Sequence, residues 1–491
     1  MRSLRALLTA LGVLLLAFLL VGLGWAGTRV WRALDWEQLE ETADLARKAN
    51  ELAWMGRQAL SQEARAPNLV LILFDDLGLG DLGSHGNRLV STPAMDRLAG
   101  EGMVFDAYYA PAPVCTPSRA GLLTGRWPVR TTLTEVVFPT GHPVDWLQRS
   151  AHQPVRLPAD EITLAEALRA GGYATAAIGK WHLGDHSPSL PRNLGFEEYF
   201  GVLYSNDMSP FALWHDEAII APDPVDQATL TPRYTRQAVR FIEAHANEPF
   251  FLYLAHTFPH IPLHATADQA GTSPAGLYGD VVSDLDRSVG IVVETLEALG
   301  LSEQTLVVVT SDNGPWFQGS PSTFRGRKSD TFEGGMRVPF IARWPGRVPA
   351  GLRTRTVAAG VDVFPTFLGI AGVPLPRDRL IDGVDLMPVL SGSASEAETR
   401  PIFYYSGDEL QAVRLGRFKW QAARRLSYGK VPGLPFFGSV ERGPWLFDLE
   451  DDAGEAYDVS DFHPDAFARL AAIARTHERE VARAPRGWKP R

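Results

Sequence analysis

Four short, uninterrupted apolar runs are the feature of this sequence that most restricts its fold. They cover residues 68–74, 174–178, 250–255 and 305–310. Runs of this length without polar alternation are typical of strands that are buried on both faces of a sheet. Patterns with helical spacing lie between them, over about 163–170, 235–246 and 280–299. This alternation predicts an α/β fold with a large mixed, mostly parallel, doubly wound sheet sandwiched by helices.

Charged or metal-competent side chains follow each of the four runs. In chain order they are Asp75 and Asp76, Lys180 and His182, His256 and His260, and Asp312 and Asn313. One such pair fits an ordinary turn at a strand end, where Asp and Asn are common. Ligands of open α/β sheets bind in the crevice outside the carboxyl ends of the strands. Four pairs together therefore predict one site at this edge of the sheet.

Length, charge and cysteine content narrow the class of protein. A chain of 491 residues fits one large α/β domain with a smaller appendage. The net charge of -10 argues against a nucleic-acid partner, although it allows a local basic pocket for an anion. The single cysteine excludes an internal disulfide framework and a zinc site with several thiolates.

The pattern changes after about residue 400. Short strands are expected at 402–405, 412–415 and 445–449, and a final helix at 464–481. They predict a smaller C-terminal α+β subdomain with an antiparallel sheet, interrupted by an insertion at about 424–443. We therefore divide the chain into an N-terminal targeting segment (1–28), a helical spacer (29–66), a catalytic domain (67–400) and a C-terminal subdomain (401–491).

The N-terminus has the character of a membrane-targeting element. Arg2 and Arg5 precede an uncharged, leucine-rich stretch over 6–28. It is either a signal peptide or an uncleaved membrane anchor. The helical pattern over 35–65 is either a spacer or the first helix of the body. Export is expected, and the absence of an Asn-x-Ser/Thr sequon favours a bacterial periplasm, with or without a tether to the inner membrane.

Cys115 is the residue with the most informative neighbours. A lone cysteine is usually a small buried hydrophobe. Pro117 can open a helix, because the first helical turn needs no amide partner at that position. Cys115 then lies at a positive helix N-terminus, where an oxyanion is stabilised, and Arg119 follows one turn later.

The motif Cys-x-Pro-x-Arg at 115–119, followed by Ala-Gly-x-x-Thr-Gly at 120–125, resembles the signature of the sulfatase family within the alkaline phosphatase-like superfamily. Further motifs match that family in order. They are Asp75-Asp76, Gly-Lys-Trp-His-Leu-Gly at 179–184, Pro-His-x-Pro at 259–262, Ser-Asp-Asn-Gly at 311–314, and Lys328 before Glu-Gly-Gly at 333–335. The resemblance covers about 67–460.

The resemblance implies that Cys115 is the precursor of formylglycine (3-oxoalanine). A formylglycine-generating or maturase enzyme would act on the motif in the unfolded chain. One hydroxyl of the hydrated aldehyde would attack sulfur, and the second would expel sulfate by re-forming the aldehyde. The implied reaction is hydrolysis of an aryl or carbohydrate sulfate ester to an alcohol and inorganic sulfate.

A hard cation suits the negative charge of a sulfate ester, and hard cations take oxygen ligands. Asp75, Asp76, Asp312 and Asn313 supply such oxygens, and the formylglycine at Cys115 would add another. The family implies Ca2+, one ion per chain. The number of carboxylates alone does not distinguish Ca2+ from Mg2+.

The remaining roles are also carried over from the family. Arg119 would hold the oxygens of the nucleophile, and His182 would be the base that triggers sulfate release. Lys180 would share the formylglycine and sulfate pocket. The positions around the leaving ester oxygen, where a proton or positive charge is needed, would be His260 and Lys328. Ser205 matches the position of a hydroxyl that contacts sulfate.

Other residues near these motifs are assigned more generally. His256 precedes His260 by four residues and is expected to be structural. Substrate specificity is expected to depend on 131–156, 204–231, 316–324 and the insertion near Gly433. Aromatic side chains in these loops suit an aryl group or a sugar face. They are Trp146, Phe211, Trp214, Trp316 and Phe317.

Two alternative functions remain open at this point. A phosphomonoester, phosphodiester or phosphonate ester hydrolase of the same superfamily would use a similar site. A catalytically silent sulfoglycan-binding protein would keep the fold without the reaction. The complete set of charged residues argues against the silent protein, since a binding module does not need a modifiable cysteine beside a metal site.

Overall fold

The computed structural model describes residues 44–59, 66–394, 400–427 and 439–489. The predicted targeting segment over 6–28 and the centre of the insertion, including Gly433, lie outside the described residues. Among the described helices, none combines the length and the apolarity that crossing a membrane requires.

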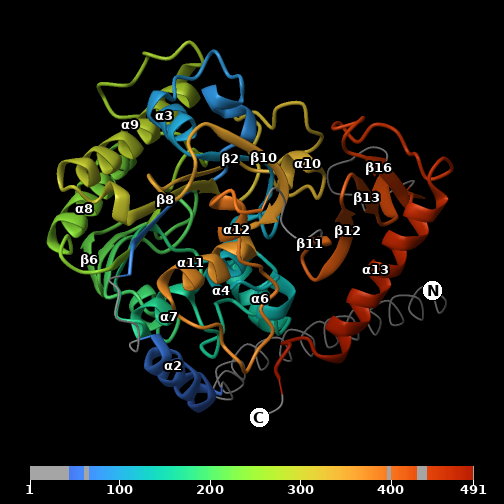
Figure 1. The fold of residues 1–491 in the computed structure, drawn as a ribbon, viewed down its shortest axis with the longest axis horizontal. Helices are drawn as coiled ribbons and strands as arrows, with labels where there is room; N and C mark the ends of the chain where they lie inside the picture. The colour runs from blue at the N-terminus through green and yellow to red at the C-terminus, as the bar shows by residue number, and fades with distance from the viewer. Residues whose placement is uncertain (1–43, 60–65, 395–399, 428–438, 490–491) are drawn as a thin grey trace, which may run out of the picture.

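A ten-stranded sheet forms the centre of the molecule (Figure 1), in the order β10-β2-β9-β8-β1-β7-β3-β4-β5-β6. Most neighbours are parallel; β9 runs antiparallel to β2 and β8, and β5 to β4 and β6. Its strands are β1 (Asn68–Phe74), β2 (Met103–Tyr109), β3 (Ala174–Lys180), β4 (Glu198–Val202), β5 (Leu213–His215), β6 (Ala218–Ala221), β7 (Phe250–Ala255), β8 (Thr305–Ser311), β9 (Phe340–Arg343) and β10 (Leu352–Ala359). The predicted fold class is confirmed.

The four predicted apolar strands are neighbours at the middle of this sheet. β1 and β7 have the predicted bounds, while β3 and β8 extend slightly further. Ile72 of β1 pairs with Leu254 of β7 on one side and with Val309 of β8 on the other. Because the four strands run parallel, their carboxyl ends meet at one edge, as the sequence predicts.

Helices cover both faces of the sheet (Figure 1). Leu71 and Leu73 of β1 pack in one apolar cluster with α4, α7 and α11, whereas Val70 and Ile72 pack in another with α3, α8 and α9. The helices are α2 (Leu45–Ala59), α3 (Pro93–Glu101), α4 (Cys115–Thr124), α5 (Pro128–Thr131), α6 (Pro143–Ser150), α7 (Leu164–Ala170), α8 (Leu230–Ala244), α9 (Gly276–Ala298), α10 (Glu333–Met336), α11 (Val363–Ala371), α12 (Met387–Leu390) and α13 (Pro464–Arg483). The alternation of β1 side chains between two clusters explains why the whole run is apolar.

Short 3-10 helices connect several of these elements. They are η1 (Leu79–Asp81), η2 (Gly83–His85), η3 (Pro191–Leu194), η4 (Gln227–Thr229), η5 (Ser302–Gln304) and η6 (Gly360–Asp362). α8 begins at Leu230, five residues before the predicted start, because η4 leads directly into it.

A four-stranded antiparallel sheet in the order β11-β12-β13-β16 forms the smaller C-terminal unit (Figure 1). Its strands are β11 (Ile402–Ser406), β12 (Glu409–Leu415), β13 (Phe418–Gln421) and β16 (Trp445–Asp448), and α13 packs against β12 and β13. The insertion contributes the separate pair β14 (Arg424–Ser427) and β15 (Ser439–Arg442). Lys419 of β13 lies buried 2.7 Å from the Glu455 carboxylate and 3.4 Å from that of Glu333, which joins this sheet to α10.

The helix α2 belongs to the packed body of the protein. Met55 is fully buried in the same apolar cluster as α7, and Gly56 lies against the backbone of Ala170. The ammonium of Lys48 lies 2.5 Å from the carboxylate of Glu166 in α7. Through these contacts, residues 45–59 form the first described helix of the body.

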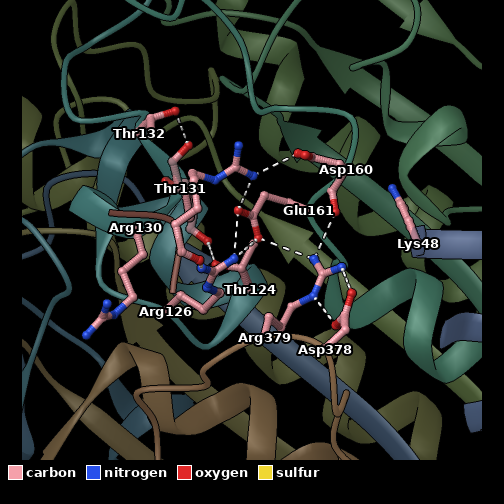
Figure 2. A network of polar contacts seen from close by, with 12 residues as sticks. Lys48, Thr124, Arg126, Arg130, Thr131, Thr132, Asp160, Glu161, Asp378 and Arg379 are labelled. Atoms are coloured by element: carbon pink, nitrogen blue, oxygen red, sulfur yellow. Dashed lines mark hydrogen bonds and ion pairs between the residues drawn. The ribbon is translucent and has the colours of Figure 1, made fainter. Parts of the chain in front are cut away.

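Below the C-terminal end of α4, a buried carboxylate holds several distant segments together (Figure 2). Glu161 accepts hydrogen bonds from Arg126 at 2.7 and 2.8 Å and from Arg486 at 2.7 Å. Arg379 lies 3.6 Å from the same carboxylate, and Trp488 packs over the guanidinium groups of this cluster. Through Arg486 and Trp488, the cluster holds the segment that follows α13, here called the C-terminal tail, against the end of the helix that carries Cys115.

Candidate active site

Cys115 is the first residue of α4, a few residues after the end of β2. Val114 is the N-cap in extended conformation, and the Cys115 side chain is buried. Burial raises the pKa of the thiol, although Lys180 and Lys328 partly oppose this effect. The thiol is therefore protonated at neutral pH and is a weak nucleophile as it stands.

The carboxylates of Asp75, Asp76 and Asp312 converge beside Cys115 from the ends of β1 and β8. The amide of Asp312 donates to the Phe74 carbonyl at 3.0 Å, and the amide of Asp76 donates to Asp312 Oδ1 at 3.2 Å. Asp76 adopts a left-handed backbone conformation with φ of 68°, which few non-glycine residues adopt outside sites with a special requirement. Adjacent parallel strands thus place all three carboxylates together.

Three buried cations face these carboxylates. Lys180 Nζ donates to Asp75 Oδ2 at 2.5 Å, and Lys328 Nζ donates to Asp76 Oδ2 at 2.9 Å. Arg119 Nε and Nη2 both lie 2.9 Å from Asp312 Oδ2. These ion pairs balance charge that would otherwise be too costly to bury.

The same residues fit a divalent cation. One ligand atom each of Asp75, Cys115 and Asp312 lies within 4.8 Å of the others. Asp75 Oδ1 and Asn313 Oδ1 are buried oxygens without a hydrogen-bond partner among the described residues, while Asn313 Nδ2 donates to Asp76 Oδ1 at 2.7 Å. Unsatisfied carboxylate and amide oxygens are the donors that hard cations prefer.

The pKa shifts of the carboxylates also favour a bound cation. Burial, followed by the nearby Asp75 charge, raises the pKa of Asp312, against the opposing effect of Arg119. Burial alone would raise the pKa of Asp75, but Lys180, His260, Arg119 and Lys328 together hold it well below its ordinary value. Two carboxylates this close together and this deeply buried favour a further positive charge beside them.

His182 lies in the same site as a neutral imidazole. Burial, followed by the charges of Lys180 and Arg119, places its pKa well below the ordinary value. Nε2 lies 3.0 Å from the Val137 carbonyl and therefore carries the proton, whereas Nδ1 is buried without a partner among the described residues. An unprotonated Nδ1 in this position can accept a proton.

His260 is oriented by a residue that the sequence analysis did not assign. Asn206 Oδ1 lies 2.9 Å from His260 Nδ1, which leaves Nε2 3.8 Å from Asp76 Oδ2. Ser205 accepts a hydrogen bond from Lys180 Nζ at 3.0 Å and lies 3.4 Å from His260 Nε2. The only sequence signal for Asn206 was its position next to Ser205.

His256 does not take part in this cluster. Its ring stacks on Phe74 at 5.6 Å, and its Nε2 lies 3.2 Å from Ser288 Oγ in α9. Burial lowers its pKa to about 3. His256 therefore packs inside the protein, in agreement with its expected structural role.

Three of the five aromatic residues expected in the cleft differ clearly in their surroundings. Phe211 is buried in the core cluster shared with α8 and α9, so its assignment to the cleft is wrong. Trp316 and Phe317 form an edge-on pair at 4.9 Å, and Phe317 is 69% exposed. The amide of Lys328 donates to the carbonyl of Pro315, so this pair lies on the loop beside the candidate site.

The structure thus brings together the predicted site residues from seven separate segments. Each of these residues except His182 either contacts another predicted site residue or contributes a ligand atom to the cluster around Asp75. His182 lies close enough for the charges of Lys180, Arg119 and Asp75 to shift its pKa. Such a concentration of oxygen donors and cations at the carboxyl edge of a doubly wound sheet defines a class of protein: hydrolases of anionic esters.

Comparison with known proteins identifies the family within this class. The sequence profile described as Sulfatase matches residues 67–373, and that described as N-sulphoglucosamine sulphohydrolase, C-terminal, matches residues 327–464. The chain belongs to the sulfatase family and is a sulfuric ester hydrolase.

Individual relatives agree with this assignment. The chain is 37% identical to an N-acetylgalactosamine-6-sulfatase of Canis lupus familiaris, over 84% of this chain and 86% of the relative. It is 33% identical to the steryl-sulfatase of Homo sapiens, over 73% and 75% of the two chains. A sulfatase structure from Pseudoalteromonas sp. has a TM-score of 0.76 at 25% identity and covers 89% of this chain and 95% of its own.

Proposed function

We propose that the protein hydrolyses the sulfate esters of saccharides, through a formylglycine made from Cys115 and with a bound Ca2+. One observation supports this most strongly: Cys115 is the first residue of α4, and its sulfur lies within 4.8 Å of a carboxylate oxygen of Asp75 and of Asp312. A thiol whose pKa is raised by burial has little use there as a nucleophile, whereas an oxygen-bearing side chain at this position could both bind a cation and react.

Formylglycine would supply a geminal pair of hydroxyls, one to attack sulfur and one to release sulfate. Arg119 and Lys180 would orient these hydroxyls, since the Arg119 guanidinium is fixed by Asp312 and by the Lys180 carbonyl, which accepts from Nη1 at 2.7 Å. Nδ1 of His182 would accept the hydroxyl proton during release, because Nε2 already donates to Val137.

Asp75, Asp76, Asp312 and Asn313 would hold the cation, and Ca2+ is the ion that membership of the family implies. The cation would neutralise negative charge on the sulfate oxygens. On the other side of the ester, His260 and Lys328 would supply the proton and positive charge that the departing oxygen needs. Ser205 would donate a hydrogen bond to sulfate.

The saccharide substrate is supported by the relatives named N-acetylgalactosamine-6-sulfatase and by the Trp316–Phe317 pair next to Lys328, in which Phe317 is exposed. Aromatic faces stack on sugar rings. We propose to assay mature protein with a sulfated saccharide, an aryl sulfate and an aryl phosphodiester in parallel. Faster turnover of the phosphodiester would replace this proposal with the phosphodiesterase alternative, and the absence of turnover on all three would favour the silent binding protein.

Export is part of the proposal. The uncharged stretch over 6–28 behind Arg2 and Arg5 supports transfer to a bacterial periplasm, where the segment is either cleaved or retained as an anchor in the inner membrane. A formylglycine-generating or maturase enzyme would modify Cys115 before folding, since the folded chain buries it. N-terminal sequencing of protein recovered from the periplasm distinguishes a cleaved signal from an anchor, and recovery from the cytoplasm alone contradicts export.

A further inference from the structure

A second cavity, of about 770 Å3, lies between the β10 edge of the large sheet and the turn between β12 and β13 of the small sheet. Its lining contains two acidic residues, Asp106 and Glu450, but six arginines: Arg337, Arg353, Arg355, Arg400, Arg414 and Arg417. This concentration of positive charge is notable in a chain with a net charge of -10.

Four of the arginines already have partners that hold the cavity walls. Arg353 Nη2 lies 2.5 Å from Asp106, and Arg337 Nε donates to the Asp106 carbonyl at 2.6 Å. Arg417 pairs with Asp448 and Asp451, and Arg400 pairs with Asp362. These four do not require a ligand to explain their presence.

Arg414 is different. It is only 7% exposed, and Nε donates to the Gly416 carbonyl at 3.0 Å. Nη1 has no hydrogen-bond partner among the described residues; it forms only a long ion pair of 3.8 Å with Glu333 Oε2, and the guanidinium lies 5.1 Å from the centroid of the Tyr109 ring. Burial lowers the pKa of Arg414 to about 10, so it remains charged at neutral pH. A buried guanidinium N–H group that makes no hydrogen bond is costly, and an anionic ligand would supply the missing bond.

Arg355 supplies the second available charge. It is exposed on β10, and it makes no hydrogen bond or ion pair with the residues that the structure describes. Charged residues on an edge strand often prevent pairing between sheets, which is a sufficient reason for Arg353 and Arg355. It does not explain Arg414, which is buried on the opposite wall and belongs to a different sheet.

We propose that this cavity is a second anion-binding site, in which Arg355 and Arg414 hold a sulfate or carboxylate group of an acidic saccharide. Guanidinium groups bind such oxyanions through paired hydrogen bonds. None of the residues assigned to the reaction lines the cavity, but residues 322–324 line it from the loop that leads to Lys328. The site is therefore suited to a second charged group of an extended substrate. Its saccharide assignment rests on the proposed function; its anion binding does not.

Binding is tested first, in protein carrying Cys115→Ala so that no turnover occurs. The probes are inorganic sulfate and a heparin hexasaccharide, measured by calorimetry. We expect Arg355→Gln to raise the Kd of the hexasaccharide about tenfold, as loss of one charged hydrogen bond predicts. Arg414→Lys keeps the positive charge but loses the guanidinium, and so tests the contribution of this buried residue to binding. Arg240→Gln, at an exposed arginine of α8, is the matched control. Unchanged affinity in both Arg355→Gln and Arg414→Lys would overturn the proposal.

Kinetics of the mature enzyme then identify the source of the anion. We expect Arg355→Gln to raise the KM for the hexasaccharide, with kcat and the KM for a monosulfated monosaccharide unchanged. An equal rise in both KM values would place Arg355 in the catalytic pocket and overturn the second site. Arg355-dependent binding of inorganic sulfate that the hexasaccharide does not displace would overturn the saccharide assignment. Failure of wild-type enzyme to release sulfate from any substrate would refute the proposed function, and the binding measurement would still decide the anion site.

Discussion

Arg119 and Asp312 form a fully buried ion pair in which Nε and Nη2 of the guanidinium both lie 2.9 Å from one carboxylate oxygen. Nη1 is used separately, on the Lys180 carbonyl. The pair therefore fixes the side chain that lies one helical turn from Cys115. It also links the helix α4 to the ends of β3 and β8.

Substitution of this arginine should damage both folding and activity. Arg119→Ala leaves Asp312 buried without its main partner, and we expect a loss of about 3–5 kcal/mol in the free energy of unfolding. Arg119→Lys keeps the charge but loses the forked contact, so kcat should fall at least about a hundredfold with a smaller change in stability. Thermal unfolding and steady-state kinetics measure the two effects. An Arg119→Lys enzyme with wild-type kcat would contradict the role given to the guanidinium.

Metal content should depend on the carboxylates of β1 and β8. Asp312→Ala removes an oxygen donor from the cluster with Asp75 and Cys115, so bound calcium and sulfate release should both fall by more than about tenfold. Elemental analysis of dialysed protein measures the first, and the exposed Asp461→Asn is the control. Full calcium occupancy in Asp312→Ala would show that the cation is held elsewhere.

The cluster in Figure 2 should matter for stability and not for chemistry. Burial opposes ionisation of Glu161, but Arg126, Arg486 and Arg379 lower its pKa to about 2. Glu161→Gln keeps the size and leaves the three guanidinium groups without their shared anion. We expect a loss of about 3–5 kcal/mol in the free energy of unfolding, while the exposed Glu243→Gln should be neutral. A Glu161→Gln protein with unchanged denaturant midpoint would disprove this account of the tail.

His477 should make the protein sensitive to acid. Its ring stacks on Phe403 at 3.6 Å, and burial, aided by Arg130, lowers its pKa from 6.5 to about 3. Between these two values the unfolded chain binds a proton that the folded chain does not, so stability falls as the pH drops from 6.5 towards 3, by up to about 1.4 kcal/mol per pH unit.

The test compares variants across this range. His477→Leu should show a smaller loss of stability between pH 6.5 and pH 4 than wild-type protein, measured by urea unfolding, whereas the exposed His215→Leu should follow wild type. Identical pH dependence in His477→Leu and wild type would mean that His477 does not carry the effect.

The central strands and the site were predictable for the same reason. A strand buried on both faces must be apolar throughout, so 68–74 and 305–310 are visible in the sequence, and the polar residues at their ends mark the site. The edge strand β10 was not predicted, because Arg353 and Arg355 interrupt the run of apolar residues that marks the central strands. The sequence also left the role of His256 ambiguous, because it does not show whether the strand continues from His256 to His260 or ends in a turn between them.

Contacts between residues that are far apart in the chain could not be predicted from the sequence. Asn206 orients His260 across 54 positions, and Arg126 meets Arg486 and Glu161 only after the tail folds back under α4. No local pattern marks such pairs, because each partner alone looks like an ordinary polar surface residue. Phe211 illustrates the opposite error: an aromatic residue in a loop segment was assigned to the cleft but packs in the core.

In the proposed reaction an oxidised Cys115, and not its thiol, attacks the sulfate ester. Mass spectrometry of the peptide containing Cys115 tests it most directly, on protein produced with and without a formylglycine-generating enzyme. Conversion to formylglycine lowers the peptide mass by about 18 Da. We predict that the rate of sulfate release rises in proportion to the converted fraction and is absent in unconverted protein. Full activity in protein whose Cys115 retains its thiol mass would contradict the claim.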